Sequence, residues 1–261
     1  MSKLMTIAIK QQDSTDSFKT TRSFINSLEI SSAAFLEKIL GTKKRIVSFE
    51  TLLIKNGIYN LITMSEDIHT HIESQLKFYF PGITIQNEDD PIQNLKMHVT
   101  EFVLESNPFN PLLTFENYPG IDSIFNSYKE LLNNQSDSDL TLIQLTLSNK
   151  KEGWQDKVVN KIEKGNRKHT HHRSEYTDIN LISDKLNYPC FDCSLRVAST
   201  TNKNQNIVNN LFNTTERQWS NKIVTSSKNL FLNNSIDNLL DRTNKKDSIL
   251  NSSEITTLWH I

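Results

Sequence analysis

The stretch that decides the fold is residues 46–85, IVSFETLLIKNGIYNLITMSEDIHTHIESQLKFYFPGITI. Its first part alternates apolar and polar side chains with a period of two, which is typical of a strand with one buried face. The residues on one face are Val47, Phe49, Thr51 and Leu53. Asn56-Gly57 then gives a strong hairpin signal, and residues 58–64 supply the returning strand.

The second part of the stretch changes to helical spacing. Ser65 can cap a helix whose first turn carries Glu66 and Asp67, and Pro81-Gly82 can end that helix. Its apolar stripe is Ile68, Ile72, Leu76 and Tyr79. A short strand at 83–85 completes a ββαβ unit, and residues 95–105 add a further strand. We therefore predict an α+β fold, with mixed or antiparallel sheets covered on one face by helices.

A second, weaker α/β lobe is expected downstream of this unit. It contains strands at 140–148 and 191–197 and helices at 119–132, 154–162, 178–186 and 203–219. The second strand alternates cleanly between apolar residues and Asp192, Ser194 and Arg196, which predicts one wet face. Residues 220–250 are rich in Asn and Ser and predict a loose connection with one apolar helical turn near 236–240.

The chain thus divides into four expected regions. They are an N-terminal helical segment at 1–45, a first α/β lobe at 46–118, a second at 119–219, and a linker with the start of a junction helix at 220–261.

The composition limits the class of protein. The 261 residues carry a formal net charge of -1, so no global basic field draws the chain to nucleic acid or to a membrane. Two cysteines rule out a disulfide scaffold and fit a reducing compartment. No run approaches the roughly 18 apolar residues of a membrane span, and residues 1–10 are too weakly apolar for a signal peptide. We expect a cytoplasmic protein.

Nucleotide-binding motifs do not occur in the sequence. There is no G-x-x-x-x-G-K-[ST] phosphate loop, and the segment Gly41-Thr42-Lys43-Lys44 lacks both the preceding glycine and the hydroxyl that would hold magnesium. We interpret that segment as an ordinary turn between a helix and a strand. The sequence predicts no ATP hydrolysis by this chain alone.

Two groups of potential metal ligands also favour ordinary structure. His169, His171 and His172 lie between Lys168 and Arg173, whose charges repel a cation, so a solvated loop is the better interpretation. Cys190 and Cys193 lie three positions apart at the start of a strand, where they face opposite sides, and we expect two packing cysteines. We therefore predict no metal and no cofactor. The acidic run Glu88-Asp89-Asp90 predicts a solvated loop, with docking of a basic surface as the alternative.

The last segment begins as a capped helix. Asn251 or Ser252 can accept hydrogen bonds from the first turn, and Glu254 lies beside the positive helix end. The segment then stops on Trp259-His260-Ile261 without a helix-ending residue, so we expect the front end of a longer protein.

Several segments, taken in order, resemble one family. They are residues 48–50, 72–75, 79–81, 88–90, 112–115, 142–147 with Trp154, 191–197, and the terminal 250–254 and 258–260. Together they are similar to the N-terminal region of conjugative type IV secretion ATPases, the TraG-like DNA translocases of the HerA/FtsK class. The resemblance implies an α/β domain placed before the motor, with the junction at Glu254, Leu258, Trp259 and His260. The Walker segments of the family have no counterpart in this chain, and no matching position is catalytic.

Two functional hypotheses follow. The first is a non-catalytic domain that packs subunits in a ring or docks to the secretion channel, and that meets DNA only through the motor. The second is a self-standing cytoplasmic interaction protein that binds nucleic acid weakly through two basic clusters. Those clusters are Lys43, Lys44 and Arg45, and Arg167, Lys168 and Arg173.

Overall fold

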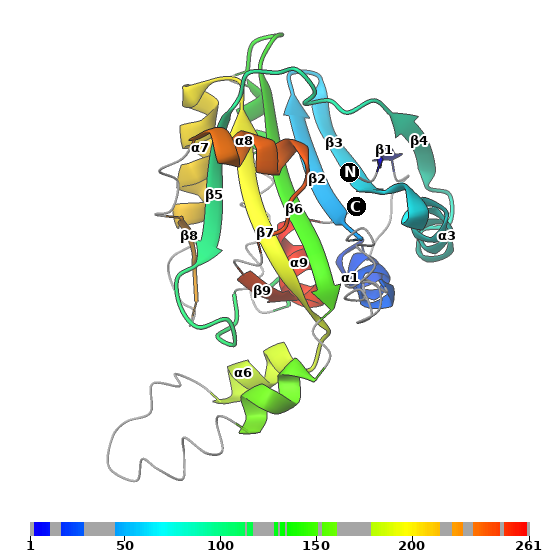
Figure 1. Cartoon of the computed structure of the whole chain (residues 1–261), viewed down its shortest axis with the longest axis vertical. Coiled ribbons are helices and arrows are strands. Elements are labelled where there is room, and N and C mark those ends of the chain that lie inside the picture. The colour runs from blue at the N-terminus through cyan, green and yellow to red at the C-terminus, as the bar shows by residue number, and fades with distance from the viewer. Residues whose placement is uncertain are drawn as a thin grey trace.

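A computed structural model describes residues 3–10, 17–28, 45–112, 114–116, 128–129, 131–133, 135–150, 153–160, 179–214, 221–226, 232–245 and 248–259. Within these residues, nine strands form one antiparallel sheet (Figure 1). The strands are β1 (Leu4–Lys10), β2 (Val47–Ile54), β3 (Gly57–Ser65), β4 (Thr84–Glu88), β5 (His98–Leu104), β6 (Leu140–Lys150), β7 (Cys190–Ser199), β8 (Ile223–Thr225) and β9 (Ser248–Asn251). Their order is β4-β1-β3-β2-β6-β7-β5-β8, and β9 pairs with β7 beyond the end of β5. The predicted α+β class is confirmed.

The helices are α1 (Ser17–Ser27), α3 (His69–Tyr79), α6 (Ile179–Leu186), α7 (Asn202–Thr214), α8 (Leu232–Leu240) and α9 (Ser252–Leu258), with a 3-10 turn η1 (Glu66–Ile68) before α3. Residues 154–160 are also helical. The expected helix at 119–132 lies mostly outside the described residues, although 128–129 and 131–132 are helical. No helix in the described part of the chain combines the length and apolar character needed to cross a membrane.

The predicted hairpin is present, and β2 and β3 pair as far as Ile54 and Gly57. Ser65 precedes the first helical turn as expected, but its hydroxyl accepts a hydrogen bond from the backbone N–H of Ile46 at 3.2 Å instead of capping the helix. The strand after α3 does not return to the hairpin. It pairs with β1, a strand that the sequence pattern does not predict, and β1 lies between β3 and β4.

The strands of the two expected lobes lie in the same sheet. β2 from the first lobe pairs with β6 from the second, with Phe49 opposite Leu145, and β5 pairs with β7. The expected boundary between residues 118 and 119 is therefore not a boundary between sheets. The long hydrophobic strands at the centre of the sheet pair with each other across that boundary. Sequence periodicity alone cannot show which strands pair.

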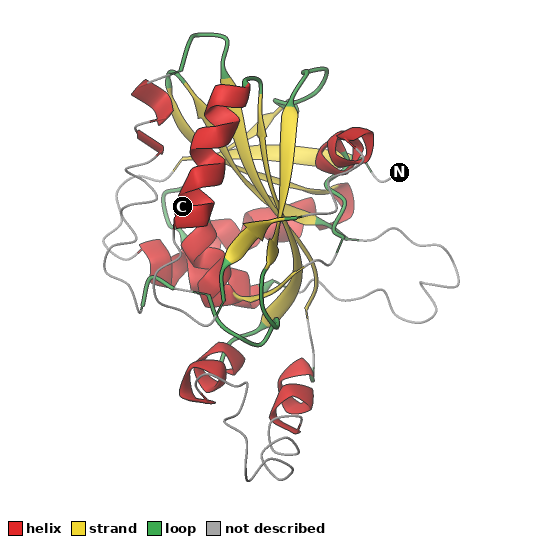
Figure 2. Ribbon diagram, turned by 90° about the vertical axis from the view of Figure 1, so that its left-hand side faces the viewer, coloured by secondary structure: helices red, strands yellow, loops and turns green. Residues whose placement is uncertain are grey.

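The two faces of the sheet differ. The face that carries Phe49, Leu145 and Leu195, here called the helix face, packs against α1, α3, α7 and α9 and holds the larger hydrophobic core. The opposite face, here called the α8 face, is covered by α8 and by the chain between β4 and β5. Figure 2 shows the helix α8 on one side of the sheet and most of the other helices on the opposite side. The prediction that helices cover only one face is therefore wrong.

The region expected as a loose connection also has a defined structure. Within 220–250 the chain forms β8, α8 and β9, and it passes from the α8 face through the plane of the sheet to α9 on the helix face (Figure 1). Asn244 and Ser248 of this region are buried and form hydrogen bonds with strands of the sheet, so the polarity of the region does not indicate exposure.

Candidate functional site

A row of polar side chains crosses the α8 face. Glu50 of β2 lies opposite Gln144 of β6, which lies opposite Arg196 of β7, which lies opposite Glu101 of β5. Directly opposed residues of antiparallel strands share a face, so four neighbouring strands present one continuous row. All four side chains are buried. We call these four residues the charge row.

Hydrogen bonds join the charge row from end to end. Gln144 Nε2 donates to Glu50 Oε1 at 3.1 Å, and Arg196 Nη1 donates to Gln144 Oε1 at 3.1 Å. Arg196 Nε donates to Glu101 Oε1 at 3.2 Å. The prediction of a wet face for β7 is therefore wrong, since every residue from Cys190 to Ser199 is buried. The charge row faces residues 241–245, here called the clamp segment, and not solvent.

Arg242 of the clamp segment anchors one end of the row. Its Nε donates to Glu50 Oε1 at 2.9 Å and its Nη2 donates to Asp90 Oδ1 at 2.9 Å. The side chains of Arg242 and Glu50 are 0% exposed. Burial by itself would lower the pKa of Arg242, but the facing carboxylates of Glu50 and Asp90 raise it above its usual value. The guanidinium therefore stays charged. The backbone of Arg242 adopts a left-handed conformation with φ +49° at the turn after α8.

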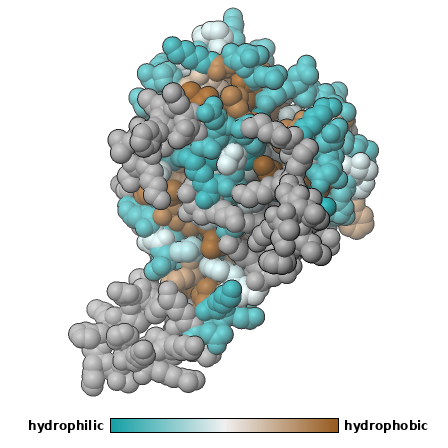
Figure 3. Space-filling model, in the orientation of Figure 1, coloured by the Kyte–Doolittle hydropathy of each residue, from teal (hydrophilic) through white to brown (hydrophobic). Residues whose placement is uncertain are grey.

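Further bonds hold the other end of the clamp segment. Lys245 Nζ donates to Glu101 Oε2 at 2.7 Å, and Arg196 donates to the carbonyl of Thr243. Asn244 Nδ2 donates to the carbonyl oxygens of Thr146 on β6 and Asp192 on β7, at 3.0 and 2.8 Å. Figure 3 shows hydrophilic residues on the outer surface in the middle of this face, and the charge row itself lies buried beneath that surface.

The charges in this network balance. The carboxylates of Glu50, Glu101 and Asp90 face the cations of Arg196, Arg242 and Lys245. Such a paired and hydrogen-bonded group of ions fixes one arrangement of the chain. Removal of Arg242 would leave Glu50 buried without a cation, and removal of Glu101 would leave Arg196 buried without a carboxylate. The role of the network is therefore structural, since it fastens the clamp segment to the sheet.

Sequence reasoning does not find this network. It names Asp90 as part of an acidic loop and Arg196 as a residue of a wet face, and it includes Glu50 and Gln144 only within segments that resemble a family. The available signal was the presence of one or two charged residues within the otherwise apolar or neutral strands β2, β5 and β7.

A second buried ion pair lies at the start of α9. Lys185 Nζ of α6 lies 3.0 Å from Glu254 Oε2, and both side chains are 0% exposed. Asn251 caps the helix by accepting from the N–H of Glu254 at 2.8 Å, and Glu254 Oε2 accepts from the N–H of Asn251 at 2.8 Å. Glu254 Oε1 also accepts from the N–H of Leu112 at 2.6 Å. The predicted cap is confirmed as a capping box.

The expected junction residues pack inside this chain. Trp259 is 2% exposed and stacks on Phe49 with the ring centroids 4.4 Å apart, while its Nε1 donates to the carbonyl of Glu50 at 3.2 Å. Leu258 packs against the same core. Together with Glu254, they join α9 to β2 and to the backbone at residue 112; His260 lies outside the described residues.

The predicted nucleic-acid contacts are described at one position. Arg45 Nε donates to Asp67 Oδ2 at 3.1 Å on the surface. Lys43, Lys44, Arg167, Lys168 and Arg173 lie outside the described residues, as do the histidines at 169–172. Among the residues that the structure describes, no group of three or more His, Cys, Asp or Glu is arranged to hold a metal.

The two cysteines are buried free thiols in β7. Burial raises the pKa of Cys190 to about 12 and raises the pKa of Cys193 well above its usual value. Neither thiol is poised as a nucleophile, because the thiolate is the reactive form. The expectation of packing cysteines agrees with this environment.

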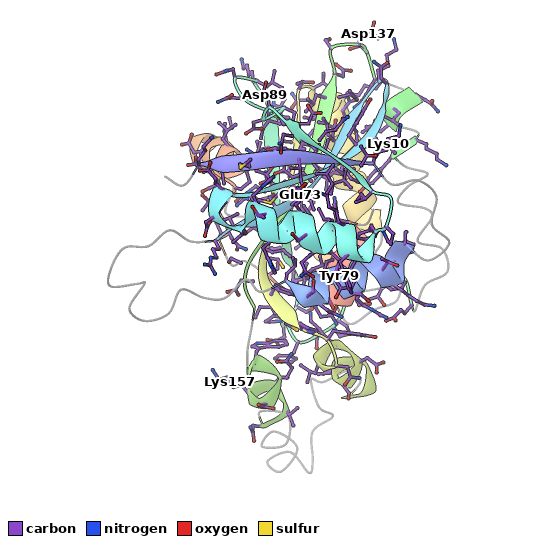
Figure 4. All side chains as sticks on the ribbon, turned by 90° about the vertical axis from the view of Figure 1, so that its right-hand side faces the viewer. Lys10, Glu73, Tyr79, Asp89, Asp137 and Lys157 are labelled. Carbon is purple, nitrogen blue, oxygen red and sulfur yellow. The ribbon has the colours of Figure 1, made fainter. Side chains whose placement is uncertain are left out.

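A pocket of about 200 Å³ lies on the α8 face at the start of the chain that crosses from β4 to β5. Its floor comes from three strands and consists of Ala8, Leu52, Ile54 and Leu61. Tyr59, Glu88 and Asp89 border it, and the Tyr59 side chain is 42% exposed. In Figure 4, Asp89 lies on the opposite side of β1 from Glu73 and Tyr79 of α3.

No protein-family model matches the chain, and the comparison with curated proteins finds no match either.

Proposed function

We propose that the chain is a non-catalytic assembly and docking domain of a conjugative DNA-transfer ATPase, working at the cytoplasmic side of the transfer machinery. The observation that carries the proposal is that the segments behind the family resemblance meet in space. Phe49 and Glu50 contact Trp259, and the backbone at residues 112 and 115 donates hydrogen bonds to α9 at Glu254 and Thr257. Residues 142–147 and 191–197 pair along β6 and β7.

The two ends of the sheet support the docking part of the proposal. β4 and β8 are the edge strands of the described sheet, and most of β4 is exposed. An exposed edge strand offers unpaired backbone groups to a further strand, which is one route to a subunit ring or to a channel protein.

Deletion of this reading frame from its mobile element tests the proposal. We expect the frequency of mating transfer to fall, and complementation with the intact frame to restore it. Cross-linking in the same cells should join this chain to itself or to a secretion component. Unchanged transfer in the deletion strain, with no such cross-link, would contradict the proposed function.

The alternative of nucleic-acid binding gains no specific support from the described residues, because Arg45 is engaged by Asp67. A gel-shift titration in low salt, where phosphate contacts are strongest, checks it directly. We expect no shift of single- or double-stranded DNA at micromolar protein.

A further inference from the structure

The pocket on the α8 face combines an apolar floor with an acidic rim. Leu52 and Leu61 are almost fully buried at the floor, whereas Glu88 and Asp89 are exposed at the rim. The pocket therefore presents two different chemistries to one ligand, and a ligand that fits must carry both.

The size of the pocket points to a single side chain. Pockets for small-molecule ligands usually measure about 300–1,000 Å³, whereas an engineered apolar cavity of roughly 150 Å³ accepts benzene. At about 200 Å³, this pocket matches one aromatic or branched aliphatic group. Buried apolar anchors of this kind dominate the energetics of many protein interfaces.

The acidic rim of the pocket favours a ligand with positively charged groups. Within the described part of the chain, no side chain forms an ion pair or hydrogen bond with the carboxylate of Glu88 or Asp89. The neighbouring Asp90 is held by Arg242, which fixes the position of the rim on the sheet. A rim that is fixed before binding costs little ordering when a partner arrives.

We propose that this pocket docks a partner segment in which one aromatic or branched apolar side chain is flanked by lysine or arginine. The apolar side chain enters between Leu52, Leu61 and Tyr59, and the flanking cations pair with Glu88 and Asp89. The proposal rests on the docking function above and names the chemistry of the partner.

Peptide titration of the full chain, followed by NMR of the backbone amides, tests the proposal. The probes are three short peptides with Lys-Phe-Lys, Lys-Ala-Lys and Glu-Phe-Glu at their centres. The Lys-Phe-Lys peptide should bind and shift the amide signals of residues 8, 52–61 and 88–90. The other two should bind at least fivefold more weakly, because each lacks one of the two chemistries.

Two variants sharpen the test. Asp89→Lys should weaken binding of the Lys-Phe-Lys peptide about fivefold or more, since it replaces attraction by repulsion. Ala8→Leu should block the pocket and abolish the shifts. Asp184→Lys on α6 is the matched control, because Asp184 is also exposed and lies on a different element. It should leave binding unchanged.

Four results would overturn the proposal: equal binding of all three peptides, shifts confined to other surfaces, equal effects of Asp89→Lys and Asp184→Lys, or no shift at millimolar peptide. If the peptides do not bind but the chain still assembles in cells, the proposal for the pocket is wrong and the docking function stands. Peptide binding without any effect of the deletion on transfer removes the docking function and leaves the pocket.

Discussion

The helix face of the sheet and the charge row on the α8 face are buried by different physics. Leu145 and Gln144 are neighbours on β6, and both are buried, but Leu145 meets an apolar core while Gln144 meets Glu50 and Arg196. Burial of the helix face is stabilised by the removal of apolar surface from water, which does not require contacts in particular directions. The α8 face also has an apolar cluster, which includes Leu52, Leu142 and Leu239. Its charge row, however, depends on partners in fixed positions, because no water is there to replace a partner that an ion loses. Polarity in a strand therefore does not identify the solvent side.

The largest expected effect belongs to the α8 face. Arg242→Met leaves Glu50 buried without its cation, and breaking a buried pair in this way typically costs about 3–5 kcal/mol of unfolding free energy. Chemical denaturation of the purified chain measures this loss. The double variant Arg242→Met with Glu50→Gln should recover part of it, since the stranded charge is then removed. A loss of less than about 1 kcal/mol in the single variant would show that the pair is not desolvated in solution.

A truncation on the helix face should cost somewhat less. Leu145→Ala removes apolar contacts in the core and leaves a cavity, which costs about 2–5 kcal/mol. Leu145→Met keeps most of the volume and should cost less than about 1.5 kcal/mol. Both values come from the same denaturation experiment. Equal losses for the two variants would mean that packing at this position does not follow volume, contrary to an apolar core.

A smaller effect should follow from the start of α9. Asn251→Ala removes the helix cap and the hydrogen bond from Asn251 to the carbonyl of Lys185, for a loss of about 1–2 kcal/mol. Asn251→Ser keeps a capping hydroxyl and should retain more stability. Thermal unfolding followed by circular dichroism distinguishes the two. A Ser variant as unstable as the Ala variant would place the loss outside the cap.

The smallest effect concerns the thiols of β7 at neutral pH. The raised pKa values of Cys190 and Cys193 predict that the native chain does not react with a thiol reagent at pH 8, whereas both thiols react after unfolding. The pKa of the Cys190 thiol is raised from 9.0 in the unfolded chain to about 12 in the folded chain, so its contribution to the stability of the fold is fully present below pH 9. Stability is then lost as pH rises from about 9 to about 12. Rapid labelling of the native protein would contradict this environment.

Sequence reasoning succeeds where a local pattern determines the structure. The hairpin signalled by Asn56-Gly57, the strand at 140–148 and the cap at Asn251 each depend on residues a few positions apart, and all three are present. The turn of the hairpin is formed by Lys55 and Asn56, because Gly57 already pairs with Ile54. The α+β class follows from those elements.

It fails where a long-range partner determines the structure. Glu50 and Arg242 are separated by 192 positions, so the local sequence around either residue does not indicate that they pair. β1 and β9 are short strands whose pairing partners lie far along the chain. Only the last turn of α8 is predicted, and the rest of α8 and the clamp segment lie in Asn-rich sequence that is usually exposed. The pocket arises from four strands and a crossing loop, so its floor and rim meet only in the folded chain.

Native-state amide hydrogen exchange tests the central claim, which is that the segment from Arg242 to Trp259 is an integral part of the sheet. If it is, the amides of α9 exchange only through global unfolding, with the same free energy of opening as the amides of β6. Exchange of α9 at a free energy well below that of β6 would show a separately opening tail, and the claim would then be wrong.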